Sequence, residues 1–296
     1  MHYPILIKQG SKYYHYLYSW RCMLVKVRFM WLNLSLLVDA VRVAATLLAL
    51  GVLSIEDLRT RELSARIVHA YLAVTTALFI VSFITGSGSF TLLVVYAAFS
   101  LLVSAGLFTS LYKLGLVGDG DVYVAIALGL ALFYPSIYRF TLPLEGMLPP
   151  SLVAIFYAAL TSMFLMLVNA VRVLAKYRGV LSALSTKYKI ILPFVSRPVK
   201  LREYLNGVLK HHFPVQEFTV SGTEVLVRYR LLARIDEDQA SVLRKLVDQG
   251  VLSEETYIWV SPGIPFIFHL FLGVLLLLVL GDVPLVHLLM KLFSRP

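Results

Sequence analysis

The feature that most constrains this chain is a series of apolar runs that reach or approach the length of a membrane-spanning helix. Such a helix needs about 20 consecutive, predominantly apolar residues. The runs lie at Leu34–Ile55, Ile67–Ile84, Phe90–Leu111, Val122–Tyr138, Leu152–Val173 and Ile264–Leu280. Only 15% of the 296 residues are charged, whereas soluble domains carry about a quarter. The sequence therefore predicts an α-helical polytopic membrane protein with about six transmembrane helices.

The polar stretch at residues 176–259 predicts one small α+β cytoplasmic domain between helices five and six. Residues 225–231 and 257–260 have the β-branched and aromatic composition that is typical of strands. Between them, Asp236–Gln249 has a capping residue, an apolar stripe and a terminating Gly250. A domain of this size has a modest core, so we expect it to lean on the helices or on the membrane surface. The membrane domain would comprise residues 30–175, and residues 260–296 would hold the last helix and the tail.

The distribution of Lys and Arg indicates the orientation. Arg59, Arg61 and Arg66 follow the first apolar run, and Lys113 follows the third. Cytoplasmic loops carry an excess of these residues. We therefore expect a multi-pass protein of the cell membrane with both of these loops at the cytoplasmic face.

Residues 1–29 conflict with this orientation. They hold five Lys and Arg residues and no acid, yet they would lie on the outer side. We therefore expect translation to begin at or near Met30, and the extension before it to be dispensable. A genuine amphipathic arm that lies on the outer surface is the alternative.

Two acidic spots border the apolar runs on the expected cytoplasmic face. One is Gly118–Asp121, which opens the fourth run, and the other ends the first run and holds Glu56, Asp57 and Glu62. A charged side chain at membrane depth costs several kcal/mol, so such clusters are candidate functional sites. Two carboxylates in contact cannot both ionise, and they can hold a water between them as aspartic proteases do.

Asp57 and Asp121 are the candidate catalytic pair. Gly118 and Gly120 lack side chains and permit unusual backbone dihedrals, which would let a substrate backbone approach Asp121. Simpler interpretations are an acidic helix cap at residues 118–121 and an ion pair between Asp57 and Arg61, four residues apart.

The sequence predicts no metal ion, no cofactor and no nucleic-acid partner. The one cysteine, Cys22, excludes an internal disulfide and a cysteine-based metal site. The histidines show no ligand spacing. The net charge of +10 comes from cations beside helix ends and in the polar segment, so it reports topology more than nucleic-acid binding. Asp39 and Arg42, three residues apart, are expected to form a local ion pair near the outer surface.

Three segments resemble the type IV prepilin peptidase family in its archaeal preflagellin peptidase branch. They are Asp57–Glu62 after the first run, Gly118–Asp121 before the fourth and Pro262–Phe266 before the last. The resemblance implies an aspartic endopeptidase that cleaves short basic leaders from preflagellins and pilin-like precursors, with Asp57 and Asp121 as its aspartates. The bacterial branch adds a four-cysteine zinc segment and N-methylation, and the single cysteine argues against both. Presenilin-type proteases share Gly-x-Gly-Asp, but their Pro-Ala-Leu motif is missing here.

The resemblance also implies a substrate and leaves one alternative open. The precursor's apolar segment would lie among the helices, and its basic leader would be attracted by Glu56, Glu62 and Asp119. Glu56 and Glu62 are also alternatives for the role of Asp57. Helix ends alone place the shared proton on Asp57, because a helix C-terminus disfavours an anion and a helix N-terminus favours one. A proton-coupled transporter or channel that uses the same acids as a relay is the alternative function.

Overall fold

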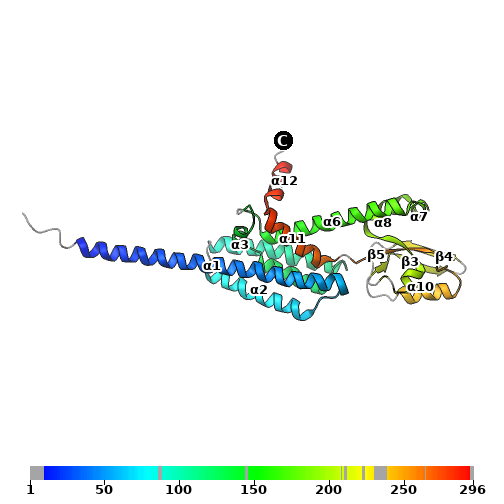
Figure 1. Ribbon diagram of the computed structural model, residues 1–296, viewed down its shortest axis with the longest axis horizontal. Coiled ribbons are helices and arrows are strands. Elements are labelled where there is room, and N and C mark those ends of the chain that lie inside the picture. The colour runs from blue at the N-terminus through cyan, green and yellow to red at the C-terminus, as the bar shows by residue number, and fades with distance from the viewer. Residues whose placement is uncertain are drawn as a thin grey trace, which may run out of the picture.

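The computed structural model describes residues 10–85, 89–143, 146–207, 209, 212–221, 224–229, 239–263 and 265–293. Side chains are described from residue 34 onward, apart from residues 219–226 and 239. Most of the long helices form one bundle, and a small α+β region lies at one end of it (Figure 1). The expected start of translation at Met30 lies before the residues whose side chains are described, and it remains a prediction. The expected helix cap at Asp236 lies outside the described residues and also remains a prediction.

In the part of the chain that the structure describes, four helices are long and apolar enough to cross a membrane. They are residues 34–60 of α1 (Gly10–Thr60), α2 (Ala65–Thr85), the continuous helix Phe90–Lys113 and α6 (Pro150–Lys176). The third consists of α3 (Phe90–Leu101), a π-helical turn (Leu102–Gly106) and α4 (Leu107–Lys113). A fifth span exists if α11 (Phe266–Leu280) and α12 (Val283–Phe293), which meet at an 84° bend, count as one.

The prediction of a fourth spanning helix at Val122–Tyr138 is wrong, because the helix found there is too short. α5 is the 13-residue helix Asp119–Ala131 and is followed by a 3₁₀ turn, Pro135–Phe140. At 1.5 Å per residue α5 is about 20 Å long, well short of the hydrocarbon core. Pro135 fixes the start of the 3₁₀ turn, and the chain between Leu132 and Tyr134 is not helical. The described residues therefore hold four or five candidate spans instead of six. Val122–Tyr138 is not one of them, and the expected last helix, Ile264–Leu280, counts only if the bent pair α11 and α12 is one span.

α5 lies at the centre of the bundle despite its short length. Seven of its residues are buried, and several of them are small: Val124, Ala125, Ala127, Leu128, Gly129, Leu130 and Ala131. Gly129 packs so closely on the π-helical turn that a Cβ there would lie 2.1 Å from Ser104 Oγ. The C-terminal half of this short helix is thereby fixed against the surrounding helices.

The expected ion pair between Asp39 and Arg42 is present, but it is buried in the bundle. Arg42 is 1% exposed, and its Nη1 lies 3.3 Å from Asp39 Oδ1. The guanidinium also donates to Ser82 of α2 and lies 4.7 Å from the centroid of the Phe133 ring. The pair therefore connects α1, α2 and the segment after α5, at the end of the bundle away from Asp57.

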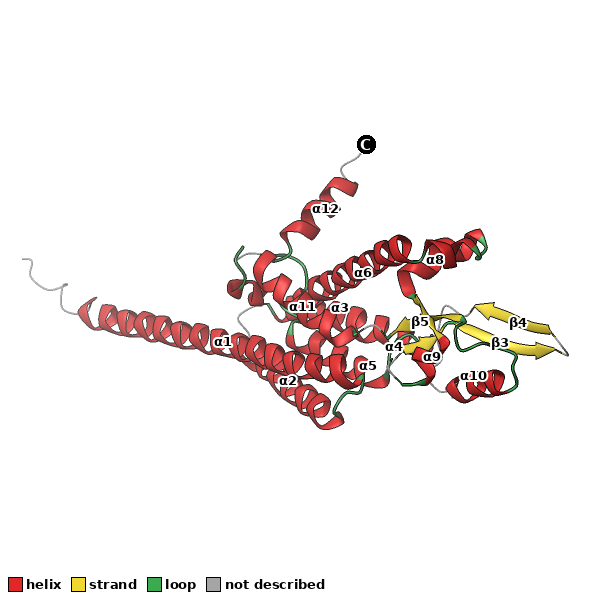
Figure 2. Ribbon diagram, turned by 45° about the vertical axis from the view of Figure 1, so that its right-hand side comes forward, coloured by secondary structure: helices red, strands yellow, loops and turns green. Residues whose placement is uncertain are grey.

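The α+β region spans about residues 186–262 and consists of short elements. They are α8 (Thr186–Val195), β1 (Arg197–Lys200), α9 (Leu201–Leu205), β2 (His212–Pro214), β3 (Gln216–Ser221), β4 (Glu224–Tyr229), α10 (Gln239–Asp248) and β5 (Tyr257–Pro262). β5 is the central strand of an antiparallel sheet with the order β1-β5-β2, and β3 and β4 form a separate hairpin (Figure 2). The expected strands correspond to β4 and β5, and the expected helix corresponds to α10.

This region leans on the membrane helices, as its small size leads one to expect. Val173 of α6, Leu192 of α8 and Trp259 of β5 share one buried cluster. Asn169 of α6 donates from Nδ2 to the carbonyl oxygens of Pro193 and Ser196. β5 ends at Pro262, and α11 begins at Phe266, so the sheet is joined to the bundle through a very short connection.

The close backbone contact between α6 and α11 gives a test of the bundle. At Gly273 of α11 a Cβ would lie 2.2 Å from the carbonyl oxygen of Ala154 in α6, whereas at Gly51 of α1 it would lie 3.7 Å from the Phe271 ring. We expect Gly273→Ala to destabilise the bundle by about 1–3 kcal/mol, because the helices must move apart. Gly51→Ala should be nearly neutral. Thermal unfolding of both variants in detergent checks this, and equal apparent Tm values would contradict the packing.

Candidate active site

Asp57 lies in the last turn of α1 and is held by the first turn of α11. Its Oδ2 accepts a hydrogen bond from the Ile267 amide at 2.9 Å, and the Phe268 amide also interacts with it. Asp57 is only 8% exposed. The first amides of a helix have no partners inside the helix, and they carry its positive dipole end. The start of α11 therefore stabilises the anionic form of Asp57.

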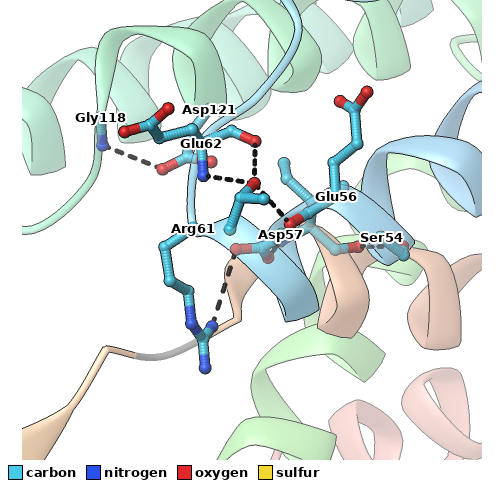
Figure 3. A network of polar contacts seen from close by, with 9 residues as sticks. Ser54, Glu56, Asp57, Arg61, Glu62, Gly118 and Asp121 are labelled. Carbon is cyan, nitrogen blue, oxygen red and sulfur yellow. Dashed lines mark hydrogen bonds and ion pairs between the residues drawn. The ribbon is translucent and has the colours of Figure 1, made fainter. Parts of the chain in front are cut away.

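Arg61 adds a positive charge on the other side of Asp57. Arg61 Nη1 lies 3.6 Å from Asp57 Oδ1, so the ion pair expected from their spacing is present. Arg61 has a φ of 58°, in the left-handed region that non-glycine residues seldom adopt. Thr60 Oγ1 accepts from the Glu62 amide and donates to main-chain carbonyl oxygens, which fixes this tight turn between α1 and α2. Figure 3 shows the network.

Asp121 reaches the same place from the N-terminus of α5. Its Oδ2 accepts from the Gly118 amide at 2.9 Å, so the helix cap that was the simpler interpretation of this motif is also real. Burial raises the pKa of Asp121 to about 6; the Gly118 amide opposes this shift, and the negative charges of Asp57 and Asp119 add to it. Asp57 and Asp121 therefore interact electrostatically although 64 positions separate them in the chain.

The two glycines of the motif do not need unusual dihedrals. Gly118 has an extended backbone with φ of −78°, and Gly120 lies within α5. Neither glycine therefore has a dihedral that only glycine allows, and the approach of a substrate backbone to Asp121 stays a prediction. Within Gly115–Val122, the positive φ of 70° belongs to Gly115, which follows α4. Gly120 is instead close to the α1–α2 turn, because a Cβ there would lie 3.1 Å from Leu63 Cδ1. Close packing of the first turn of α5 against the α1–α2 turn therefore accounts for this glycine.

The three further acids differ in their contacts. Glu56 Oε2 accepts from the Ser64 amide at 2.9 Å, so this carboxylate caps the start of α2. Glu62 and Asp119 are exposed, and Asp119 accepts from the Gly120 amide at 2.8 Å. Glu62 and Asp119 thus lie at the solvent side of the site, whereas Glu56 has a structural contact of its own.

Sequence analysis did not single out Ile267 or His269. Ile267 contributes only its main-chain amide, which no residue pattern reports. His269 is 2% exposed, and its Nδ1 lies 3.1 Å from Thr161 Oγ1. Its Nε2 has no hydrogen-bond partner among the described residues, and its ring interacts electrostatically with Arg61. An isolated histidine in an apolar helix carries no spacing signal that could have identified it.

No group of three or more His, Cys, Asp or Glu side chains in the described ranges is arranged to hold a metal ion. The groups that the site brings together are its two carboxylates, the Arg61 guanidinium and the amides at the start of α11.

Comparison with known protein families gives two matches. The model of the type IV leader peptidase family matches residues 44–171, which include Asp57 and Asp121. The chain belongs to this family. The model of the archaeal peptidase A24 C-terminus, type II, matches residues 188–283, which include the sheet and α11. No curated protein matches the chain significantly.

The protein is therefore an aspartic-type leader peptidase of the archaeal branch and a multi-pass membrane protein. The two family matches meet in the structure, because the first contains both aspartates and the second contains the α11 amide that holds Asp57. The candidate site of this leader peptidase thus draws on both parts of the chain.

The role of Glu56 can be tested by stability. We expect Glu56→Ala to lower the free energy of unfolding by roughly 1 kcal/mol, because the Ser64 amide loses its acceptor. Glu62→Ala removes an exposed carboxylate from the same turn and serves as the matched control. Chemical or thermal unfolding in detergent measures both, and an unchanged Glu56→Ala variant would mean that the cap contributes nothing.

Proposed function

We propose that Asp57 and Asp121 are the catalytic pair, and that the enzyme cleaves basic leader peptides from preflagellin- or prepilin-like precursors at the cytoplasmic membrane face. The observation that supports this most is that the side chains of Asp57 of α1 and Asp121 of α5 lie in one neighbourhood, near enough for their charges to interact (Figure 3). Family membership supports the substrate class. The cations that follow α1 and α4, Arg59, Arg66 and Lys113, support the cytoplasmic face.

The contacts favour Asp121 as the carrier of the shared proton. The dipoles of α1 and α5 alone suggest Asp57, but they omit the α11 amide and Arg61, which both stabilise the Asp57 anion. Asp121 accepts one amide at Oδ2 and meets the charges of Asp57 and Asp119, so a proton on its carboxyl group relieves repulsion. We therefore assign the base to Asp57 and the acid to Asp121.

This assignment gives a balanced reaction. The Asp57 carboxylate accepts a proton from the attacking water, and the Asp121 carboxyl group donates its proton to the oxygen of the scissile carbonyl. A tetrahedral diol forms. The carbon–nitrogen bond then breaks as the leaving nitrogen takes the proton from Asp57, and Asp121 recovers a proton from a diol hydroxyl. Both carboxyl groups end as they began, as general acid–base catalysis requires.

The exposed acids suggest how a basic leader binds. Glu62 and Asp119 lie at the solvent side of the pair, where they would attract Lys and Arg side chains. Glu56 contributes less in this proposal, because it already accepts from Ser64. The apolar segment of the precursor would lie against the helices, so the peptide bond between leader and apolar segment would be presented to Asp57 and Asp121.

Substitution of either aspartate tests the pair. Asp57→Asn and Asp121→Asn should each lower precursor cleavage by several orders of magnitude, because neither variant can pass a proton between the carboxyl groups. The assay uses purified enzyme in detergent, where cleavage needs no gradient and transport does, so it also separates the peptidase from a proton-coupled transporter. Asp248→Asn in α10 is the control. Cleavage by well-folded Asp57→Asn at near the wild-type rate would contradict the proposal.

The pH dependence tests the assignment of roles. Asp121 loses its proton as the pH rises through about 6, so the cleavage rate should fall above that pH. Asp119→Asn removes a negative charge that raises the pKa of Asp121, so the alkaline limb should move to lower pH. Asp248→Asn should leave the limb in place. A limb that moves to higher pH in Asp119→Asn would rule out Asp121 as the acid.

A further inference from the structure

A groove of about 620 Å³ lies at the end of α6, and no residue of the candidate active site lines it. Its apolar wall is formed by Val171, Leu174 and Ala175 of α6 and by Leu181 of α7 (Arg178–Ser182). Its polar part is formed by Arg178, Ser182 and Lys189, the last from α8. The groove thus combines an apolar wall with two cations and one hydroxyl.

The groove has no negative charge of its own to balance these cations. Residues 146–202 contain eight Lys and Arg residues and no Asp or Glu. Neither Arg178 nor Lys189 forms an ion pair with a residue that the structure describes. Arg178 is exposed and Lys189 is half-buried. An anion therefore fits this site, and the basic leader of a precursor would be repelled from it.

The apolar wall continues a stripe along α6. Leu160, Phe164, Leu167, Val171 and Leu174 recur at spacings of three and four, and each is between 43% and 68% exposed. This spacing places them on one helix face. The stripe ends where the candidate span Pro150–Lys176 ends, and Arg178 follows two residues later. Apolar chains can therefore lie along the stripe while a charged group lies at its end.

α8 closes the groove from the side. It lies beside α6 (Figure 2). Asn169 of α6 fixes it there by donating to the carbonyl oxygens of Pro193 and Ser196. α8 leaves Ile190 63% and Phe194 39% exposed. A helix with basic residues and exposed apolar residues is typical of a membrane interface. The groove is thus bordered by two elements that suit the boundary between acyl chains and headgroups.

We infer that this groove binds an anionic membrane lipid, with the phosphate between Arg178 and Lys189 and an apolar chain along Val171 and Leu174. Cations at the membrane surface attract anionic headgroups, and only an amphiphile can use the apolar wall as well. A bound lipid would hold α6, α7 and α8 together next to the α+β region, because Leu181 and Leu192 share a buried cluster with Trp259.

Lipid binding by the full chain in detergent tests this inference. Native mass spectrometry with phosphatidylglycerol and phosphatidylcholine should show preferential retention of phosphatidylglycerol. Arg178→Ala combined with Lys189→Ala should weaken that preference roughly tenfold. Lys245→Ala combined with Lys291→Ala removes the same charge from α10 and α12 and should retain the preference. Equal preference in both double variants would overturn the inference.

Two further arms separate the lipid from other anions. Inorganic phosphate should not compete at concentrations at which phosphatidylglycerol saturates the site, because it cannot use the apolar wall. Val171→Asn should weaken retention of phosphatidylglycerol without changing the apparent Tm, since Val171 is 59% exposed. If inorganic phosphate displaces phosphatidylglycerol effectively, the ligand of the groove is a soluble anion and the inference is wrong. The same conclusion follows if an acidic peptide displaces it and the protein shows no preference between the two lipids. None of these readouts depends on precursor cleavage.

Discussion

The hydrogen bond from the Ile267 amide to Asp57 is the interaction on which the candidate site depends. It joins residues that are 210 positions apart in the chain and places the positive end of α11 against a buried carboxylate. Without it, Asp57 would be an acid at the C-terminus of α1, where the helix dipole disfavours a negative charge. With it, and with Arg61 at 3.6 Å, the two aspartates have different surroundings and can take different roles.

The α+β region takes part in this arrangement through the chain itself. β5, the central strand of the three-stranded sheet, ends at Pro262, and α11 begins four residues later. A displacement of the sheet would therefore move the amide that holds Asp57. Trp259 and Val173 fix the sheet to α6, and the close approach of Gly273 to Ala154 fixes α6 to α11. The charge state of Asp57 is thus connected to packing contacts well outside the site.

The two acidic spots and the α+β segment leave direct signals in the sequence. Acids that border apolar runs stand out against a low background of charge, and Val225–Leu231 has the composition of a strand. The length of α5 could not be predicted in the same way, because Ala125, Ala127 and Gly129 look equally apolar in a buried short helix and in a spanning one. Two contacts could not be predicted from the sequence because they depend on tertiary packing. They are the hydrogen bond from the Ile267 amide to Asp57 and the close approach of Gly120 to Leu63.

Infrared spectroscopy of the resting enzyme at about pH 5 tests the central claim most directly. A protonated carboxyl group absorbs at a frequency separate from that of carboxylates, so the carrier of the shared proton can be found by substitution. If the start of α11 and Arg61 keep Asp57 ionised, the carboxyl band should disappear in Asp121→Asn and persist in Asp57→Asn. Loss of the band in Asp57→Asn, with its retention in Asp121→Asn, would contradict the account.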